Sequence, residues 1–285
     1  MSSVHEAACA KVNLFLHVGE RRADGFHPLQ SLAVFAGAGD VLRAEPAPQV
    51  SLTIEGPFAA GLSGEGDNLV LRAARALAAE AGTLAGANLT LTKNLPVASG
   101  IGGGSADAAA TLRALKALWH VEVADEALLD IAATLGSDVP VCVPSRAAWM
   151  EGRGEILTPV AVPHMAMLLV NPGVAVPTRE VFGALQNRSG VAMALPSGGF
   201  GNADALLAFL GRTRNDLEEP ARRIQPVISE VLDRLADQPD VLLARMSGSG
   251  ATCFALFAND TACTQAAMAL QDARPGWWVA PSHIS

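Results

Sequence analysis

The sequence predicts an α+β fold with two lobes, and three observations lead to that prediction. The chain has 285 residues, half of them hydrophobic, which is enough to fill one large core or two modest ones. Segments with strand patterning and segments with helix patterning interleave along its whole length. They do so without the regular strand–helix rhythm of a doubly wound parallel sheet. We therefore expect two lobes that meet near residues 155–165, and we divide the chain into residues 1–158 and 159–285.

Strands dominate the expected structure of the first half. Buried or alternating apolar side chains predict strands at 10–18, 30–46, 50–56 and 87–93, and a hairpin at 147–160. Apolar residues at helical spacing predict helices at 67–82, 106–119 and 125–136. The first helix has Asp67 or Asn68 as its N-cap, and the second has Ser105. We expect the segment "VPVCV" (139–143) to enter a strand.

The second half mixes shorter helices with strands. Helical spacing predicts helices at 178–186, 203–209, 217–235 and 261–273. Apolar runs predict strands at 165–170 and 276–282, and a strand, glycine turn and strand over 240–257. The segment 187–201 has no periodicity, and we expect a mobile loop there.

Composition narrows the class of protein. A net charge of −8 argues against a surface built to bind nucleic acid or an anionic membrane. No stretch approaches the roughly 18 apolar residues of a membrane span, and the first residues lack the pattern of a signal peptide. The four cysteines are far apart in the sequence, which favours reduced thiols over a disulfide framework. We expect a cytoplasmic protein without nucleic-acid or membrane partners; its oligomeric state is left open.

A glycine-rich segment, "LPVASGIGGGSADAAATLRAL" (95–115), follows a predicted strand and runs straight into a predicted helix. The first amides of a helix lack intrahelical partners, and glycines let an anion approach them closely. The two common nucleotide loops are excluded, because the chain contains no Gly-Lys pair and Ser105 stands where G-x-G-x-x-G needs a third glycine. The segment therefore predicts a phosphate site, and the alternative is a tight turn packed against a sheet.

Other motifs predict less. The turn Ser247–Gly250 is a second place where a ligand could approach bare backbone, although a simple hairpin also explains it. The nucleophile elbow G-x-S-x-G is absent, and the six histidines are scattered, so no metal site made of side chains is predicted.

Several blocks of the sequence together resemble the GHMP kinase superfamily. The glycine segment resembles that superfamily's phosphate loop, and it is joined in the expected order by "AKVNLFLHV", "DGFHPLQSL", "LGSDVPVCV", "EGRGEILTPV", "NPGVAVPTREVF" and "SGSGATCFALF". Within the superfamily, these blocks are most similar to the kinases that phosphorylate the 2-hydroxyl of 4-diphosphocytidyl-2-C-methyl-D-erythritol in non-mevalonate isoprenoid synthesis. The resemblance spans almost the whole chain.

The resemblance implies a fold and a pair of substrates. It implies an N-terminal ATP-binding lobe like the second domain of ribosomal protein S5, an α/β C-terminal lobe, and an active site in the cleft. The implied substrates are ATP, with Mg²⁺, and a cytidine diphosphate sugar alcohol. Such a site needs few protein ligands for Mg²⁺, which keeps several waters and phosphate oxygens.

The resemblance also implies the catalytic pair. Asp138 falls on the general base and Lys11 on its partner, and a carboxylate suits a base that accepts a hydroxyl proton during phosphoryl transfer. Lys11 and Asn13 alternate along a predicted strand, so both side chains lie on one face and need polar partners if buried. The alternatives are that Asp138 caps a turn and that Lys11 reaches solvent at a strand edge.

The remaining implied contacts fall into two groups. Those for the nucleotide are Asn68, Lys93, Pro96, Ala98, Ser99, Gly100, Ile101, Gly102, Gly103, Gly104, Ser105 and Ala106. Those for the second substrate are Asn13, Phe26, His27, Thr178, Phe182, Gly248 and Ser249, with the two phenylalanines stacking on the cytosine. Ser105 is a candidate for phosphate or Mg²⁺, whereas Asp107 should face sideways or meet the metal through water.

Two departures and two rival functions accompany the resemblance. Phe26 stands where the family usually has tyrosine, and Ser99 replaces a common glycine, which suggests a negative φ there. Phenylalanine keeps the stacking face, worth roughly 1–3 kcal/mol per base. The rival functions are a GHMP kinase for another alcohol, of the homoserine or mevalonate type, and a non-catalytic nucleotide or sugar sensor.

Overall fold

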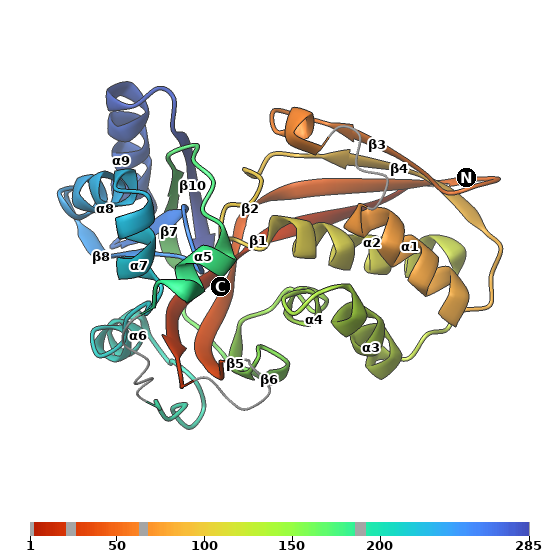
Figure 1. The fold of residues 1–285 in the computed structure, drawn as a ribbon, viewed down its shortest axis with the longest axis horizontal. Coiled ribbons are helices and arrows are strands. Elements are labelled where there is room, and N and C mark those ends of the chain that lie inside the picture. The colour runs from red at the N-terminus through yellow and green to blue at the C-terminus, as the bar shows by residue number, and fades with distance from the viewer. Residues whose placement is uncertain (1–2, 21–26, 63–67, 186–191, 285) are drawn as a thin grey trace. The chain divides into compact units, whose positions relative to one another are not determined.

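A computed structural model describes residues 3–20, 27–62, 68–185 and 192–284, and they form two compact units. The first unit takes its residues from 1–10, 39–97 and 102–145, and the second from 11–38, 98–101 and 146–285. Two long strands, β1 (Val4–Val18) and β2 (Leu29–Ala47), run through both units (Figure 1). Compactness does not test independent folding, so the division after residue 158 stays a prediction.

The first unit is a small sheet with helices packed together beside it (Figure 1). Its strands, in spatial order, are β3 (Ser51–Glu55), β4 (Gly86–Thr92) and the second part of β2. Its helices are the short 3-10 turn η1 (Ala59–Leu62), α1 (Leu69–Glu80), α2 (Gly103–Trp119), α3 (Asp125–Leu135) and α4 (Val139–Cys142). Leu42 and Leu91, paired across β2 and β4, are fully buried. The alternation of apolar and polar residues therefore predicted correctly which face of this sheet is buried in the core.

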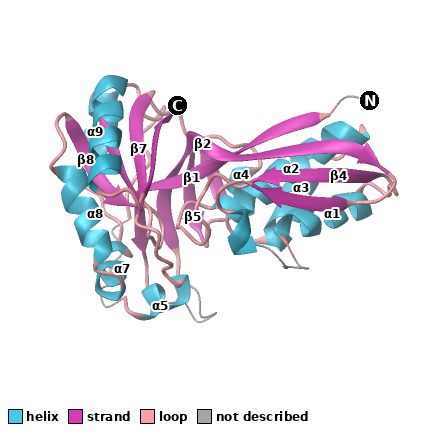
Figure 2. Cartoon of the chain, turned by 90° about the horizontal axis from the view of Figure 1, so that it is seen from above, coloured by secondary structure: helices cyan, strands magenta, loops and turns pink. Residues whose placement is uncertain are grey.

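The second unit is a larger antiparallel sheet. Its strands follow the first part of β2 in the order β10 (Trp278–Ile284), β7 (Met165–Asn171), β9 (Cys253–Phe257) and β8 (Val241–Met246). On the other side β2 pairs with the predicted hairpin, β5 (Ala148–Gly152) and β6 (Ile156–Pro159). Figure 2 shows the helices α8 (Val227–Ala236) and α9 (Asp260–Ala273) on one side of β7 and β8.

Shorter helices complete the second unit. They are α5 (Thr178–Gly183), α6 (Ala203–Leu210) and α7 (Glu218–Ile224). The helix predicted over 217–235 is two helices, α7 and α8, because Pro226 has no N–H to donate and Gln225 before it leaves the helical region. Residues 192–201 form no helix or strand, as predicted for that loop, and 187–191 lie outside the described residues.

Two local predictions for the first unit are wrong. Ser105 is not an N-cap, because α2 starts two residues earlier and Gly102, with φ +65°, is its cap. Propensity disfavours glycine in a helix, which hid the true start. Residues 139–142 of the segment are helical rather than a strand, since Pro140 fits the first turn of α4. The predicted cap Asn68 is confirmed, with its Oδ1 accepting from the Val70 amide at 2.9 Å.

The described cysteines form no disulfide, and three of the four are buried. Among the described helices, none is both long and apolar enough to cross a membrane.

Candidate active site

The first turn of α2 has backbone amides without partners inside the helix, as the glycine segment predicts. The first intrahelical bond runs from the Ala106 amide to the Gly102 carbonyl at 2.8 Å, so the amides before Ala106 have no partner within the helix. A Cβ added to Gly103 or Gly104 would meet nothing closer than 3.5 Å. Neither packing nor backbone conformation requires glycine at these two positions. The tight-turn alternative therefore does not account for Gly103 and Gly104, and the phosphate site stays a prediction.

The preceding residues, 98–101, belong to the second unit and pack against the turn at 247–252. A Cβ on Gly100, whose φ is +77°, would lie 2.6 Å from the Gly250 carbonyl oxygen and 2.7 Å from that of Ser247. The Ser247 hydroxyl donates to the Gly100 carbonyl at 3.1 Å, and the Thr252 amide donates to the Ser99 carbonyl at 3.1 Å. For Gly100, therefore, the tight-turn explanation holds. Ser99 is not among the residues with positive φ, as expected, whereas Ala98 is.

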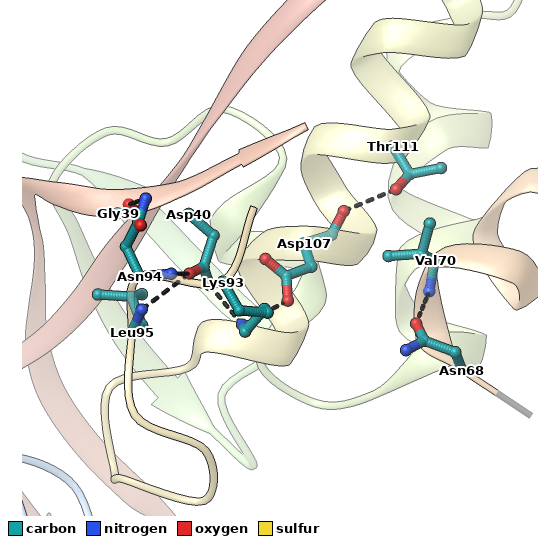
Figure 3. A network of polar contacts seen from close by, with 9 residues as sticks. All are labelled: Gly39, Asp40, Asn68, Val70, Lys93, Asn94, Leu95, Asp107 and Thr111. Carbon is teal, nitrogen blue, oxygen red and sulfur yellow. Dashed lines mark hydrogen bonds and ion pairs between the residues drawn. The ribbon is translucent and has the colours of Figure 1, made fainter. Parts of the chain in front are cut away.

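Charged side chains are buried close to the start of α2 in the first unit. The Lys93 ammonium donates to Asp40 Oδ2 and, at 2.7 Å, to Asp107 Oδ2 (Figure 3). The three residues are 1–3% exposed. Burial and the neighbouring Asp40 raise the pKa of Asp107 to about 7, although Lys93 opposes the shift. For Lys93, burial alone would lower the pKa, but the carboxylates of Asp107 and Asp40 outweigh it and raise the pKa. Asp107 faces sideways, as expected.

Asp138 stands at the start of α4, half-buried, with φ −92° and ψ −8°. The far end of this short helix is held by Arg113 of α2, whose Nη1 donates to the carbonyls of Cys142 at 3.0 Å and Val143 at 3.1 Å. The same guanidinium donates to Glu6 at 2.7 Å. The element that carries Asp138 is thus fixed to α2 and β1 by charge-assisted hydrogen bonds.

Lys11 and Asn13 lie in the part of β1 that belongs to the second unit, and both are buried, at 4% and 3% exposed. Lys11 therefore does not reach solvent at a strand edge. Asn13 has the polar partners that its burial requires, because its Nδ2 donates to Ser31 Oγ at 2.7 Å and its amide to Ser247 Oγ at 3.1 Å. Since Lys11 and Asp138 belong to different units, their pairing stays a prediction.

Four of the seven residues expected to contact the second substrate form two pairs in the second unit. The rings of His27 and Phe182 have centroids 6.0 Å apart. His27 Nδ1 donates to the Gly19 carbonyl at 2.9 Å, which sets the tautomer and orients the ring. The hydroxyls of Thr178 and Ser249 are 2.8 Å apart. Phe26 lies outside the described residues.

Sequence reasoning missed Asp40 and Arg113, and it missed Asn215, whose Nδ2 donates to the Gly248 carbonyl at 2.8 Å. Asp40 carried a signal, since it is a lone charge in the apolar strand "LAVFAGAGDVL" and such a residue needs a buried partner. The hydrogen-bond partners of Arg113 and Asn215 are distant in sequence, so no local sequence pattern predicts these contacts.

Two family models match the chain. The model of the GHMP kinases N terminal domain matches residues 68–146, and that of the GHMP kinases C terminal domain matches residues 192–274.

Curated relatives are similar over the full length. A 4-diphosphocytidyl-2-C-methyl-D-erythritol kinase of Rhodospirillum rubrum is 54% identical over 283 residues, which cover 99% of this chain and 93% of the relative. One of Cereibacter sphaeroides is 54% identical over 279 residues, which cover 97% and 98%.

Solved structures are similar as well. A crystal structure of 4-(cytidine 5'-diphospho)-2C-methyl-D-erythritol kinase superposes with a TM-score of 0.83 at 35% identity and covers 99% of both chains. A homoserine kinase from Cytophaga hutchinsonii superposes with a TM-score of 0.74 at 20% identity, covering all of this chain and 95% of the other, and shows likeness of fold.

Proposed function

The chain belongs to the GHMP kinase family, and from that premise we propose that it transfers the γ-phosphoryl group of ATP to the 2-hydroxyl of 4-diphosphocytidyl-2-C-methyl-D-erythritol. The observation that carries the proposal is the 54% identity, over nearly the full length of both chains, to kinases named for that substrate. The product is the 2-phosphate, an intermediate of non-mevalonate isoprenoid synthesis, and we propose that the enzyme works in the cytoplasm.

The first turn of α2 is the proposed seat of the triphosphate. Its amides and the positive end of the helix dipole favour an anion, and Gly103 and Gly104 leave the approach open. The described residues contain no group of three or more His, Cys, Asp or Glu side chains that could hold a metal. Mg²⁺ in kinase sites binds mainly through phosphate oxygens and waters, with one or two protein side chains. Ser105, half-buried in this turn, is the hydroxyl we assign to it, and the ion would neutralise charge on the phosphates.

Asp138 is the proposed general base, and Lys11 is its proposed partner. The carboxylate takes the proton of the 2-hydroxyl as that oxygen attacks phosphorus, a contribution of roughly 10²–10⁴-fold. The burial of Lys11 supports a role that keeps its ammonium from water, where it stabilises negative charge on the reacting oxygens. The fixed position of α4 supports a base that is already oriented before the substrate binds.

We assign the recognition of the cytidine group of the acceptor to side chains of the second unit. The rings of His27 and Phe182 offer an aromatic surface to the base, and we propose that Phe26 completes it. Asn13, Thr178, Ser249 and the backbone of Gly248 supply the polar contacts. Homoserine and mevalonate carry no base for such a surface, which argues against a kinase for base-free alcohols.

The test is a coupled assay of ADP release with the purified full chain, ATP and Mg²⁺. The cytidine diphosphate alcohol, homoserine and mevalonate are supplied as separate acceptors. We expect turnover with the first acceptor and at least about 10³-fold lower kcat/KM with the other two. Turnover restricted to a base-free acceptor would refute the substrate assignment. Nucleotide binding without turnover on any acceptor would favour a sensor.

A further inference from the structure

Asp40, Lys93 and Asp107 form an ion cluster in the first unit (Figure 3). The cluster joins the chain just before the glycine segment to the first turns of α2. Lys93 follows β4 and leads into the segment, whereas Asp107 lies in the first turns of α2, three residues after the last glycine of the segment. Asp40 is part of β2. The Lys93 ammonium therefore connects the start of the segment and the first turns of α2 to the same strand, β2.

Asp40 also fixes the backbone at the start of the segment. Its Oδ1 accepts from the amides of Asn94, at 2.6 Å, and Leu95, at 2.9 Å. The Asn94 side chain donates to the Gly39 carbonyl at 3.2 Å. Two consecutive amides bound to one carboxylate oxygen leave the chain little freedom where it turns away from β4.

Stability alone is a poor explanation for this cluster. Burying three ionisable groups costs several kcal/mol of desolvation for each ion, and well-packed apolar side chains often do as well or better. The cluster has two carboxylates for one ammonium, and Asp107 Oδ1 is buried without a hydrogen-bond partner among the described residues. Such an arrangement is better explained by the geometry it imposes than by the energy it contributes.

We propose that Asp40, Lys93 and Asp107 are positioning residues that hold the two ends of the glycine segment in register, so that the first amides of α2 are already oriented when the nucleotide arrives. The inference rests on the proposed function, and it changes the role of one residue. Lys93 directs two of its three protons to carboxylates, so it acts through Asp40 and Asp107 instead of serving as a phosphate ligand.

The predicted consequence concerns nucleotide affinity. If only a fraction of the molecules hold the segment in the binding orientation, the apparent affinity for the nucleotide is reduced by that fraction. Part of the binding free energy is then used to order the segment. The chemistry beyond binding should change little, since none of the three residues touches the reacting hydroxyl in this assignment.

The test is calorimetric titration of the full chain with a non-hydrolysable ATP analogue and Mg²⁺, beside steady-state kinetics. Asp40→Asn is the main variant: its amide cannot accept from both backbone amides and from Lys93 at once. We expect the dissociation constant and the KM for ATP to rise at least about tenfold, with the KM for the alcohol within about twofold of wild type. The matched control is Asp130→Asn, an exposed aspartate on α3, and we expect less than about a threefold change.

The direction of the change separates the two roles of Lys93. If Lys93 were a phosphate ligand restrained by Asp40, Asp40→Asn would free it and tighten nucleotide binding, which would overturn the inference. Unchanged binding by a folded Asp40→Asn variant would overturn it as well, while leaving the proposed kinase function intact. A wild-type chain that binds no nucleotide would overturn both.

A second variant covers the case in which Asp40→Asn does not fold. Asp107→Leu replaces a buried acid with an apolar group of similar size, so the chain should remain folded. Lys93 then stays on Asp40 but no longer reaches α2, and we expect the KM for ATP to rise about threefold to tenfold. An unchanged KM for ATP in this variant would again overturn the inference.

Discussion

Two glycine-rich segments of this protein use the same residue for opposite reasons. At Gly103 and Gly104, in the first unit, a Cβ would fit in ordinary van der Waals contact, with no atom closer than 3.5 Å. At Gly248, in the second unit, a Cβ would lie 2.7 Å from the Gly100 carbonyl oxygen, and Gly100 is closed off by the turn at 247–250 in return. The first segment therefore has room for a side chain at Gly103 and Gly104, while backbone fills the space at Gly100 and Gly248. The number of glycines in a sequence segment does not show whether they leave room for other atoms or are packed against backbone.

The largest expected effect comes from a variant that touches neither segment. Asp138→Asn should lower kcat by about 10²–10⁴-fold, because the amide cannot accept the hydroxyl proton. Affinity for the ATP analogue should stay within about twofold, since the first turn of α2 is unchanged. Stopped-flow or steady-state kinetics with titration calorimetry check both values, with the exposed Asp130→Asn on α3 as the control. Near wild-type turnover would remove Asp138 from the role of base.

The close contact between Gly100 and the turn at 247–250 is tested by Gly100→Ala. Its φ of +77° and the carbonyl oxygens at 2.6 and 2.7 Å should make alanine cost about 3 kcal/mol of unfolding free energy or more. Urea denaturation measures the loss. Gly276→Ala, where a Cβ meets nothing within 4 Å, is the control and should change stability by less than about 0.5 kcal/mol. A loss no larger than that of the control would contradict the packing explanation.

The space at Gly103 is tested by Gly103→Ala. Alanine in a helix is favoured over glycine by about 1 kcal/mol, so the protein should keep or gain stability. The methyl group should nevertheless raise the KM for ATP about tenfold, because it stands where phosphate oxygens approach the amides. Gly211→Ala, at the end of α6, is the control for alanine without a ligand nearby. An unchanged KM for ATP would show that nothing binds close to residue 103.

The most gradual expected effect distinguishes the segments by the pH dependence of stability. The first segment adjoins the ion cluster, where burial raises the pKa of Asp107 to about 7 from an ordinary value of 3.8. A raised carboxyl pKa means that the folded state binds the proton more tightly. Its contribution to stability is complete below about pH 4 and is lost as the pH rises through about 7.

Relative to Asp107→Asn, wild-type unfolding free energy should therefore fall across this window by at most about 1.4 kcal/mol per pH unit. Lys93 and Asp40 face Asp107, and Lys93 remains protonated throughout because its own pKa is raised. Parallel stability curves for the two proteins between pH 4 and 8 would contradict the assignment.

Much of the fold could be predicted because its signals are local. The alternation of Leu89 and Leu91 placed β4, and Asn68 before an amphipathic run placed the start of α1. The start of α2 was misplaced because its first two residues are glycines, which local propensity places outside helices. The helix α4 was missed because four residues around Pro140 carry too little periodicity to identify.

The candidate site was only partly predictable, for a different reason. The family resemblance supplied Lys93 as a nucleotide contact, but its environment depends on Asp40, which is 53 positions away in the sequence. Likewise Arg113 of α2 fixes the helix of Asp138 through carbonyl groups, which any sequence has at every position. Such contacts follow from the three-dimensional arrangement and leave no pattern in the chain.

The position of β10 has a practical consequence for handling this protein. This strand, at residues 278–284, lies inside the sheet of the second unit, between β2 and β7, with both of which it pairs. Trimming it would expose unsatisfied hydrogen-bonding groups on two neighbours at once, which invites aggregation. In a nascent chain that sheet likewise cannot close before residues 278–284 have left the ribosome, so the apolar strands β2 and β7 lack this partner until then.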